Sequence, residues 1–328
     1  MKYINLLLLV VSLLFSCHTE GETSKISQKA EVADTDSSST YYLNRAFYKY
    51  NNLRDNKGAI EDYTKAIELA PNGSEAYYNR GYVKDDLGDY EGAIEDYTTA
   101  IELNPNDSRV HYIYHNRGLA KRKSRDNEGA IEDYAKAIEL DSSFSEAYNN
   151  RGVTKGHLED YEGAIEDYTK AIELDSSFSK AYDNRGNAKS NLGDNQEAIV
   201  DYTKAIELDS SFSEAYYNRG VTKRKLGNSE AAKEAIEDYT RAIEINPNFS
   251  EAYYNRGNVK GDLGDYEGAI EDYTRAIEIN PNFSEAYYSR GDAKGNLGDL
   301  EGVVEDHTKG AEVNPNSSVK LTIEIEKM

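Results

Sequence analysis

An arginine, a lysine and an aspartate recur together along most of the chain, and their types and spacing could carry chemistry. A carboxylate between two cations can act as a general base, or it can close an ion pair. The set returns in eight copies, which favours a scaffold role, because an active site needs one such set. The copies are Arg45, Lys49 and Asp62; Arg80, Lys84 and Asp96; Arg117, Lys121 and Asp133; Arg151, Lys155 and Asp167; Arg185, Lys189 and Asp201; Arg219, Lys223 and Asp238; Arg256, Lys260 and Asp272; Arg290, Lys294 and Asp306.

The spacing suggests which of these residues meet. The arginine and the lysine lie four residues apart, so they share one face of a helix. The aspartate precedes a tyrosine of an apolar stripe, near the seam between two helices. We hypothesise that the guanidinium binds the carboxylate in a bidentate pair, either within one repeat or between adjacent repeats. The pairs that define this structural hypothesis are Arg80–Asp96, Arg151–Asp167, Arg219–Asp238 and Arg256–Asp272.

Each copy belongs to a longer repeat, of which Ser250–Phe283 is the clearest. Helical spacing of its residues predicts two helices. Between them, Gly264 can adopt a left-handed C-cap conformation and Asp265 can cap the second helix. Pro281 ends that helix. The apolar stripe of the second helix consists of Tyr266, Ala269, Ile270, Tyr273, Ala276 and Ile277.

This repeat resembles the tetratricopeptide repeat, in its length of about 34 residues and in its Gly–Tyr–Ala–Tyr–Ala–Pro order. Where the family usually has tryptophan at the fourth position, this repeat has Tyr253, and the chain contains no tryptophan. The resemblance implies an all-α fold, a right-handed superhelical solenoid of about eight helix-turn-helix units. A single hairpin cannot bury its own stripe, so the units must stack.

The repeats are predicted to fill residues 39–317, followed by a C-terminal cap or tail at 318–328 that could be a short helix or a strand. Two extra segments interrupt the period: Ser108-Arg109-Val110 and three residues within Asn228–Ala235. Three residues are close to one helical turn, so each insertion is predicted to lengthen a helix by one turn. The predicted units are Ser39–Gly73, Ser74–Asp107, His111–Phe144, Ser145–Phe178, Ser179–Phe212, Ser213–Phe249, Ser250–Phe283 and Ser284–Ser317.

The resemblance also places the sixth position of each repeat on a concave groove. That position is an asparagine in seven repeats, and its amide can both donate to and accept from an extended peptide backbone. The alternative is that these asparagines are only solvent-exposed. The residues of this candidate peptide-binding groove are Asn44, Asn79, Asn116, Asn150, Asn184, Asn218 and Asn255, with Tyr78, Tyr217, Tyr254 and Tyr288 beside them.

The N-terminus predicts export and lipid attachment. Residues 1–16 carry one lysine followed by an apolar run, the composition of a signal peptide. The four residues ending at Cys17 resemble a bacterial lipobox, which implies acylation of the Cys17 thiol; a plain secretory signal is the alternative. Residues 17–38 are polar and are predicted to be a disordered tether. By resemblance to lipoprotein sorting rules, His18 favours an outer membrane. It does not indicate whether the protein lies on the periplasmic face or on the cell surface.

Composition limits the function further. The net charge of −22 argues against nucleic acid and against anionic lipid as a partner of the folded body. This acidity has two interpretations, solubility and a preference for a basic partner. His111 and His115 share a helix face without a third ligand, so no metal site is predicted. No phosphate-binding loop or nucleophile motif is present, so no cofactor is expected.

These observations predict a non-catalytic protein-interaction scaffold, anchored by lipid at a bacterial cell envelope. Its partner would be a protein or an extended peptide, and a basic partner would account for the acidity if solubility does not. Its only membrane contact would be the lipid. The alternative function is a solute- or glycan-capture lipoprotein of an outer-membrane uptake system, whose tyrosines would stack on sugars.

Overall fold

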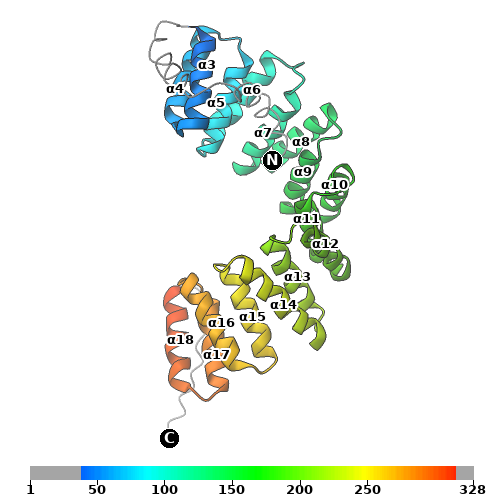
Figure 1. Cartoon of the computed structure of the whole chain (residues 1–328), viewed down its shortest axis with the longest axis vertical. Coiled ribbons are helices and arrows are strands. Elements are labelled where there is room, and N and C mark those ends of the chain that lie inside the picture. The colour runs from blue at the N-terminus through cyan, green and yellow to red at the C-terminus, as the bar shows by residue number, and fades with distance from the viewer. Residues whose placement is uncertain (1–37, 315–328) are drawn as a thin grey trace, which may run out of the picture. The chain divides into compact units, whose positions relative to one another are not determined.

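A computed structural model describes residues 38–314 of the chain, which form helices and turns without a strand in that range (Figure 1). Sixteen α-helices and one short π-helix occur there. First and second helices of hairpins alternate along the chain. The first helices are α3 (Ser39–Tyr48), α5 (Ser74–Asp86), α7 (Val110–Lys123), α9 (Ser145–His157), α11 (Ser179–Leu192), α13 (Ser213–Lys225), α15 (Ser250–Asp262) and α17 (Ser284–Asn296). The second helices are α4 (Asn56–Leu69), α6 (Tyr90–Leu103), α8 (Asn127–Leu140), α10 (Tyr161–Leu174), α12 (Asn195–Leu208), α14 (Ser229–Ile245), α16 (Tyr266–Ile279) and α18 (Leu300–Val313).

The chain divides into two compact units after Ala120, inside α7. In the first unit, α3 packs on α4, α4 on α5 and α5 on α6. In the second unit, each helix from α8 to α18 packs on the next one along the chain. This sequential packing confirms the all-α solenoid of helix-turn-helix units expected from the repeat.

Several sequence predictions lie outside the described residues. They are the signal peptide at residues 1–16, the lipidation site Cys17, the tether up to residue 37 and the C-terminal segment 318–328. Ser38, the last residue of the predicted tether, is described: its side chain accepts a hydrogen bond from the Tyr41 N–H and caps α3.

Short polar segments end the first helix of a hairpin and begin the second. Gly264 has a φ of +86°, and Asp265 caps α16 by accepting a hydrogen bond from the Gly268 N–H at 3.0 Å. Both observations confirm the turn predicted for this repeat. The corresponding caps elsewhere are Asp55, Asp89, Asp126, Asp160 and Asp299.

Small residues allow the two helices of a hairpin to approach closely. Ala269, Tyr273, Ala276 and Ile277 are buried along α16, as the stripe predicts. A Cβ atom on Gly257 would lie 2.8 Å from a ring carbon of Tyr273, so this position admits only glycine without a shift. The same contact recurs between Gly152 and Tyr168, Gly186 and Tyr202, and Gly220 and Tyr239.

The two insertions have different outcomes. The extra residues of the sixth repeat lengthen α14 to 17 residues, against 14 in α16, so that prediction is confirmed. The prediction for Ser108-Arg109-Val110 is wrong, because α7 has 14 residues and α5 has 13. Ser108 and Arg109 instead form an additional turn, in which the Val110 N–H donates to the Asp107 carbonyl at 3.0 Å. A loop that bonds to itself can absorb residues without extending a helix.

A third irregularity lies at the end of the first helix. There α3 continues as the π-helix η1 (Lys49–Leu53). The arginine and aspartate of this hairpin are 17 residues apart, one more than the separation of 16 in the second hairpin. A π-turn takes up one extra residue, so the two side chains still meet.

Candidate functional site

Seven of the eight recurring arginines bind the aspartate of their own hairpin through two hydrogen bonds. Arg256 Nε donates to Asp272 Oδ2 at 2.9 Å, and Arg256 Nη2 donates to Asp272 Oδ1 at 2.6 Å. The side chain of Asp272 is 4% exposed and that of Arg256 is 16% exposed, so most water is excluded. The same two bonds, at 2.6–3.0 Å, join Arg45 to Asp62, Arg80 to Asp96, Arg151 to Asp167, Arg185 to Asp201, Arg219 to Asp238 and Arg290 to Asp306.

The recurring lysine binds the same carboxylate. Lys260 Nζ lies 2.8 Å from Asp272 Oδ2, and it also donates to the Gly268 carbonyl at 3.3 Å. The spacing in the sequence predicted that this lysine shares a helix face with the arginine, but it did not predict a partner for the lysine. The Lys–Asp contact recurs at 2.8–3.0 Å in the hairpins of Lys49, Lys84, Lys121, Lys155, Lys189, Lys223 and Lys294.

The remaining guanidinium nitrogen reaches the preceding hairpin. Arg256 Nη1 donates to Thr240 Oγ1 at 3.0 Å, while its carbon lies 5.6 Å from the ring centroid of Tyr253. Arg151 is different, because Ala135 stands where its threonine acceptor would be. The bond to a threonine recurs in Arg80–Thr64, Arg117–Thr98, Arg185–Thr169, Arg219–Thr203 and Arg290–Thr274.

These contacts hold the carboxylates in their charged form. Burial alone would raise the pKa of Asp62 and Asp306, but the hydrogen bonds from arginine and lysine outweigh it and lower the pKa of both. Three donors from the protein occupy the two oxygens of Asp272. Three of its roughly four lone-pair sites are then filled and the carboxylate is buried, so the recurring residues suit scaffolding rather than proton transfer.

The predicted asparagine row lies on the first helices, and four of its amides bind the preceding repeat. Asn44 is exposed, whereas Asn79 and Asn150 are half-buried. Sequence reasoning missed these links because they join residues one repeat apart. The four hydrogen bonds run from Asn116 to the Tyr78 hydroxyl (3.1 Å), Asn184 to Asn149 Oδ1 (3.0 Å), Asn218 to Asp183 Oδ1 (3.0 Å) and Asn255 to the Tyr217 hydroxyl (2.9 Å).

The tyrosines beside that row pack against their own repeats. The ring centroid of Tyr217 lies 5.9 Å from that of Tyr239 and 4.8 Å from that of Phe249. Tyr254 has the same pair of neighbours in its repeat, Tyr273 and Phe283, at the same distances. Tyr288 is 7% exposed and lies edge-on to His307. These rings therefore present limited surface to a ligand.

At the repeat position just before the asparagine, which Tyr217 and Tyr254 hold, one repeat has a buried acid. Asp183 takes the place of Tyr217 one repeat earlier, and it is 6% exposed. Burial raises the pKa of Asp183 to about 6, although hydrogen bonds from Asn218 and Asn187 act in the opposite direction. The nearby Glu214 also raises this pKa.

Glutamates provide an exposed charge on the same helices. They occupy the second position of the repeat, four residues before the asparagine. A serine hydroxyl donates to the neighbouring glutamate in four repeats, at 2.8–3.1 Å. The exposed glutamates are Glu75 in the first compact unit and Glu146, Glu214, Glu251 and Glu285 in the second.

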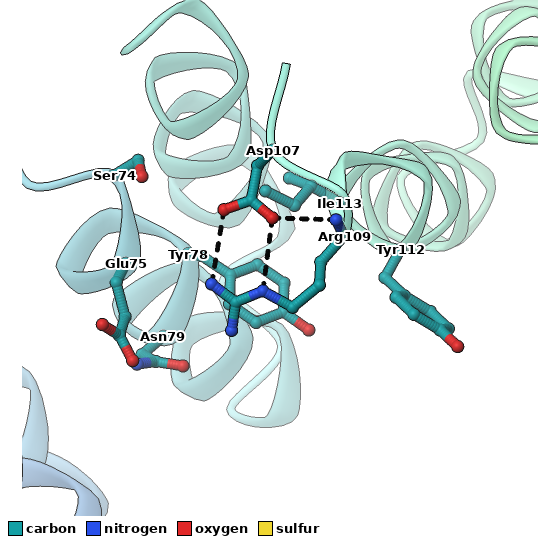
Figure 2. A pocket seen from close by; sticks show the side chains of 8 residues that line it. All are labelled: Ser74, Glu75, Tyr78, Asn79, Asp107, Arg109, Tyr112 and Ile113. Carbon is teal, nitrogen blue, oxygen red and sulfur yellow. Dashed lines mark hydrogen bonds and ion pairs between the residues drawn. The ribbon is translucent and has the colours of Figure 1, made fainter. Parts of the chain in front are cut away.

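A pocket of about 180 Å³ lies in the first unit beside the irregular turn. Figure 2 shows Tyr78 and Asn79 on one wall and Tyr112 on another, with Arg109 between them. Arg109 donates to Asp107 through its side chain at 3.3 Å and through its backbone N–H at 2.8 Å. The residues that line the pocket are Ser74, Glu75, Tyr78, Asn79, Asp107, Arg109, Tyr112 and Ile113.

Within residues 38–314, no group of three potential ligands lies close enough to hold a metal ion. No helix in that part of the chain has both the length and the apolar character needed to cross a membrane.

Comparisons with known proteins agree with this geometry. The tetratricopeptide repeat family matches residues 39–72, 74–107, 145–178, 250–283 and 272–304, and its TPR repeat form matches 118–156, 191–227 and 232–264. No curated protein matches the chain.

Two solved structures among those similar to this chain share its fold, with TM-scores above 0.5. A tetratricopeptide repeat protein from Parabacteroides merdae is 20% identical, with a TM-score of 0.58 over 75% of this chain and 95% of its own. Pseudomonas aeruginosa pilF is 18% identical, with a TM-score of 0.56 over 63% of this chain and 93% of its own. YrrB, a TPR protein with an unusual peptide-binding site, is 27% identical, with a TM-score of 0.48 over 57% of this chain and 94% of its own.

Proposed function

Because the chain belongs to the tetratricopeptide repeat family, we propose that it is a non-catalytic protein-interaction scaffold that binds extended, basic peptide segments. The segment lies along the first helices. One observation carries the proposal: the exposed glutamates recur at one position of these helices, whereas buried acids such as Asp272 are already bound by an arginine and a lysine of their own hairpin.

A row of charges at a regular interval suits an extended ligand. An extended chain advances about 3.3 Å per residue. Packed helices lie about 8–10 Å apart, so basic side chains roughly three residues apart can meet successive repeats. Glutamate and asparagine lie four residues apart on the same face of each first helix. A lysine or arginine of the ligand would meet the glutamate, while the amide oxygen could accept from the ligand backbone.

The same arrangement disfavours catalysis. A general base needs a carboxylate or imidazole within hydrogen-bond reach of a substrate proton. Asp272, like the aspartates of six other sets, is bound by its own arginine and lysine. We therefore assign the chain no enzymatic activity.

We further propose attachment to a bacterial cell envelope through a lipid on Cys17, in the outer membrane. The support is the lipobox-like sequence before Cys17 and the polar residues after it. The test compares wild type with Cys17→Ala in fractionated cells. The variant is expected to leave the membrane fraction, and unchanged retention would reject the anchor.

The groove is tested in vitro with soluble protein that begins after Cys17. The triple variant Glu214→Gln, Glu251→Gln, Glu285→Gln removes three exposed charges from the first helices of one compact unit. Its affinity for a lysine-rich extended peptide at low salt is expected to fall about tenfold or more, at roughly 0.5 kcal/mol per exposed ion pair.

The control triple Glu166→Gln, Glu237→Gln, Glu271→Gln removes the same charge from exposed positions on second helices. It is expected to lower the affinity less than threefold. Equal losses in the two triples would mean that net charge alone attracts the peptide, and the assignment of the binding face would be abandoned.

A further inference from the structure

At two junctions between repeats, a phenylalanine of the chain packs against a tyrosine of the first helix. Phe249 ends one repeat and stacks on Tyr217 at 4.8 Å, and Phe283 covers Tyr254 in the same way. In each case the tyrosine lies on a first helix and the phenylalanine lies in the loop that leads to the next repeat.

The junction after the second repeat lacks this contact. Tyr78 occupies the position of Tyr217 and Tyr254, but Asp107 stands where the phenylalanine would be. The additional turn then places Arg109 beside Tyr78, with its side chain 67% exposed. The result is the pocket of Figure 2, in which the Tyr78 ring is part of the wall.

We propose that this pocket receives an aromatic side chain of the bound peptide, in the place that Phe249 and Phe283 fill at the two junctions described above. The inference rests on the proposed function and fixes which part of the bound peptide lies at this junction. Most repeats offer the peptide similar contacts, whereas this junction accepts an aromatic ring. The volume suits that occupant, since an engineered cavity of about 150 Å³ binds benzene.

The charges around the pocket specify the residues next to the ring. Glu75 and Asp107 are acidic, and Arg109 is the one cation among the lining residues. Asp107 already binds Arg109, which leaves Glu75 to meet a lysine or arginine of the ligand. Figure 2 also shows one guanidinium nitrogen of Arg109 without a dashed line, on the side facing Glu75 and Asn79. This nitrogen can donate to a backbone carbonyl of the ligand.

Two synthetic peptides test the proposal on the soluble chain that begins after Cys17: acetyl-Lys-Lys-Phe-Lys-Lys-amide and its counterpart with alanine at the centre. Wild type is expected to bind the phenylalanine peptide at least tenfold more tightly. Asp107→Phe should fill the pocket from within and abolish that preference. Equal binding of the two peptides by wild type, or a preference that survives in Asp107→Phe, would overturn the inference.

Control variants separate the pocket from general effects. Asn248→Phe adds a phenylalanine to an exposed position of a loop whose tyrosine is already covered, so the preference should persist. Glu75→Gln changes an exposed side chain and leaves folding intact; it should weaken both peptides about threefold and preserve their ratio. Thermal melts verify that Asp107→Phe is folded, and an unfolded variant is replaced by Asn79→Trp, which enlarges a half-buried lining residue and also reduces the pocket volume.

A photo-reactive form of the peptide distinguishes this inference from the proposed function. With benzoylphenylalanine at the centre, crosslinks are expected within residues 74–113. Crosslinks spread evenly over the other first helices would overturn the pocket while leaving peptide binding in place. Peptide binding that survives loss of the first-helix glutamates, with crosslinks confined to 74–113, would instead support the pocket and reject the extended groove.

Discussion

Arg256 and Asp272 face each other across the two helices of one hairpin and are joined by hydrogen bonds of 2.9 and 2.6 Å. The aspartate is buried and also binds Lys260. The arginine continues to Thr240 of the preceding hairpin. Arg256 therefore connects the two helices of its own hairpin and links that hairpin to the preceding repeat.

Removing the carboxylate should destabilise the fold strongly. Asp272→Ala leaves Arg256 and Lys260 without their anion, and breaking a buried pair costs about 3–5 kcal/mol. We expect a loss of about 3 kcal/mol in the free energy of unfolding, because both cations retain some contact with water. Urea denaturation measures it, and Arg256→Leu should also lower the midpoint.

The exposed pair Lys204–Glu207 provides the control, since both side chains are about half exposed. Lys204→Ala should change stability by less than about 0.5 kcal/mol. If Asp272→Ala and Arg256→Leu both melt like wild type, the pair has no structural role.

The missing threonine can be restored. Ala135→Thr places a hydroxyl where Arg151 can reach it, as Arg185 reaches Thr169 at 3.1 Å. The added hydrogen bond is worth about 1 kcal/mol, from which the lower helix propensity of threonine subtracts roughly half. A small rise in the thermal midpoint is expected. The rise should disappear when Arg151 is replaced by leucine, and an equal rise in that background would exclude the bond.

Two buried tyrosines differ only in whether the hydroxyl has a partner. Tyr273 donates to Asn258 Oδ1 at 2.9 Å. The Tyr239 hydroxyl has no partner among residues 38–314, because Val221 of its own hairpin stands at the position that Asn258 holds in the next repeat. Tyr273→Phe should cost about 1 kcal/mol, and Tyr239→Phe should be neutral or stabilising. Chemical denaturation of the two variants gives the comparison. A larger loss in Tyr239→Phe would contradict the assigned hydrogen bonds.

Asp183 should make stability depend on pH. Its pKa is raised to about 6 by burial, above the value of about 3.9 in an unfolded chain. Between these values the folded state binds more protons than the unfolded state, so the contribution of Asp183 is most favourable below pH about 4 and declines until pH about 6. At pH 7 the cost approaches about 3 kcal/mol.

Asp183→Asn should remove this dependence, because the amide does not titrate in that range. The preceding repeat already has Asn149 at the same position, where it accepts from Asn184. The variant is expected to melt at a higher temperature than wild type at pH 7 and at a similar temperature near pH 4. Parallel pH profiles for the two proteins would refute the assignment.

The repeat period and the polar residues between helices were sufficient to predict the fold. Gly264 and Asp265 act within a few residues of sequence, so their roles could be derived locally. The Arg256–Asp272 pair could be proposed because both residues return in every copy. The turn at Ser108-Arg109 could not, since helix extension and an extra turn absorb the same number of residues.

Contacts between repeats were less accessible from the sequence. The bond from Arg256 to Thr240 requires the relative placement of two hairpins, which a single repeat does not specify. The asparagine row had two interpretations, a peptide-binding groove or solvent exposure, and neither predicted that Asn255 donates to Tyr217 one repeat earlier. Recurrence identifies such residues, while their partners follow only from stacking.

The threonine–arginine link has a consequence for how such a chain can grow. A hairpin with both residues offers an acceptor on one side and a donor on the other, so a duplicated copy would find a matching neighbour at either end. Recombination between near-identical gene segments could therefore add or delete whole hairpins without requiring compensating substitutions. Ala135 marks a joint where the threonine is missing, so a copy inserted after that helix would lack this bond.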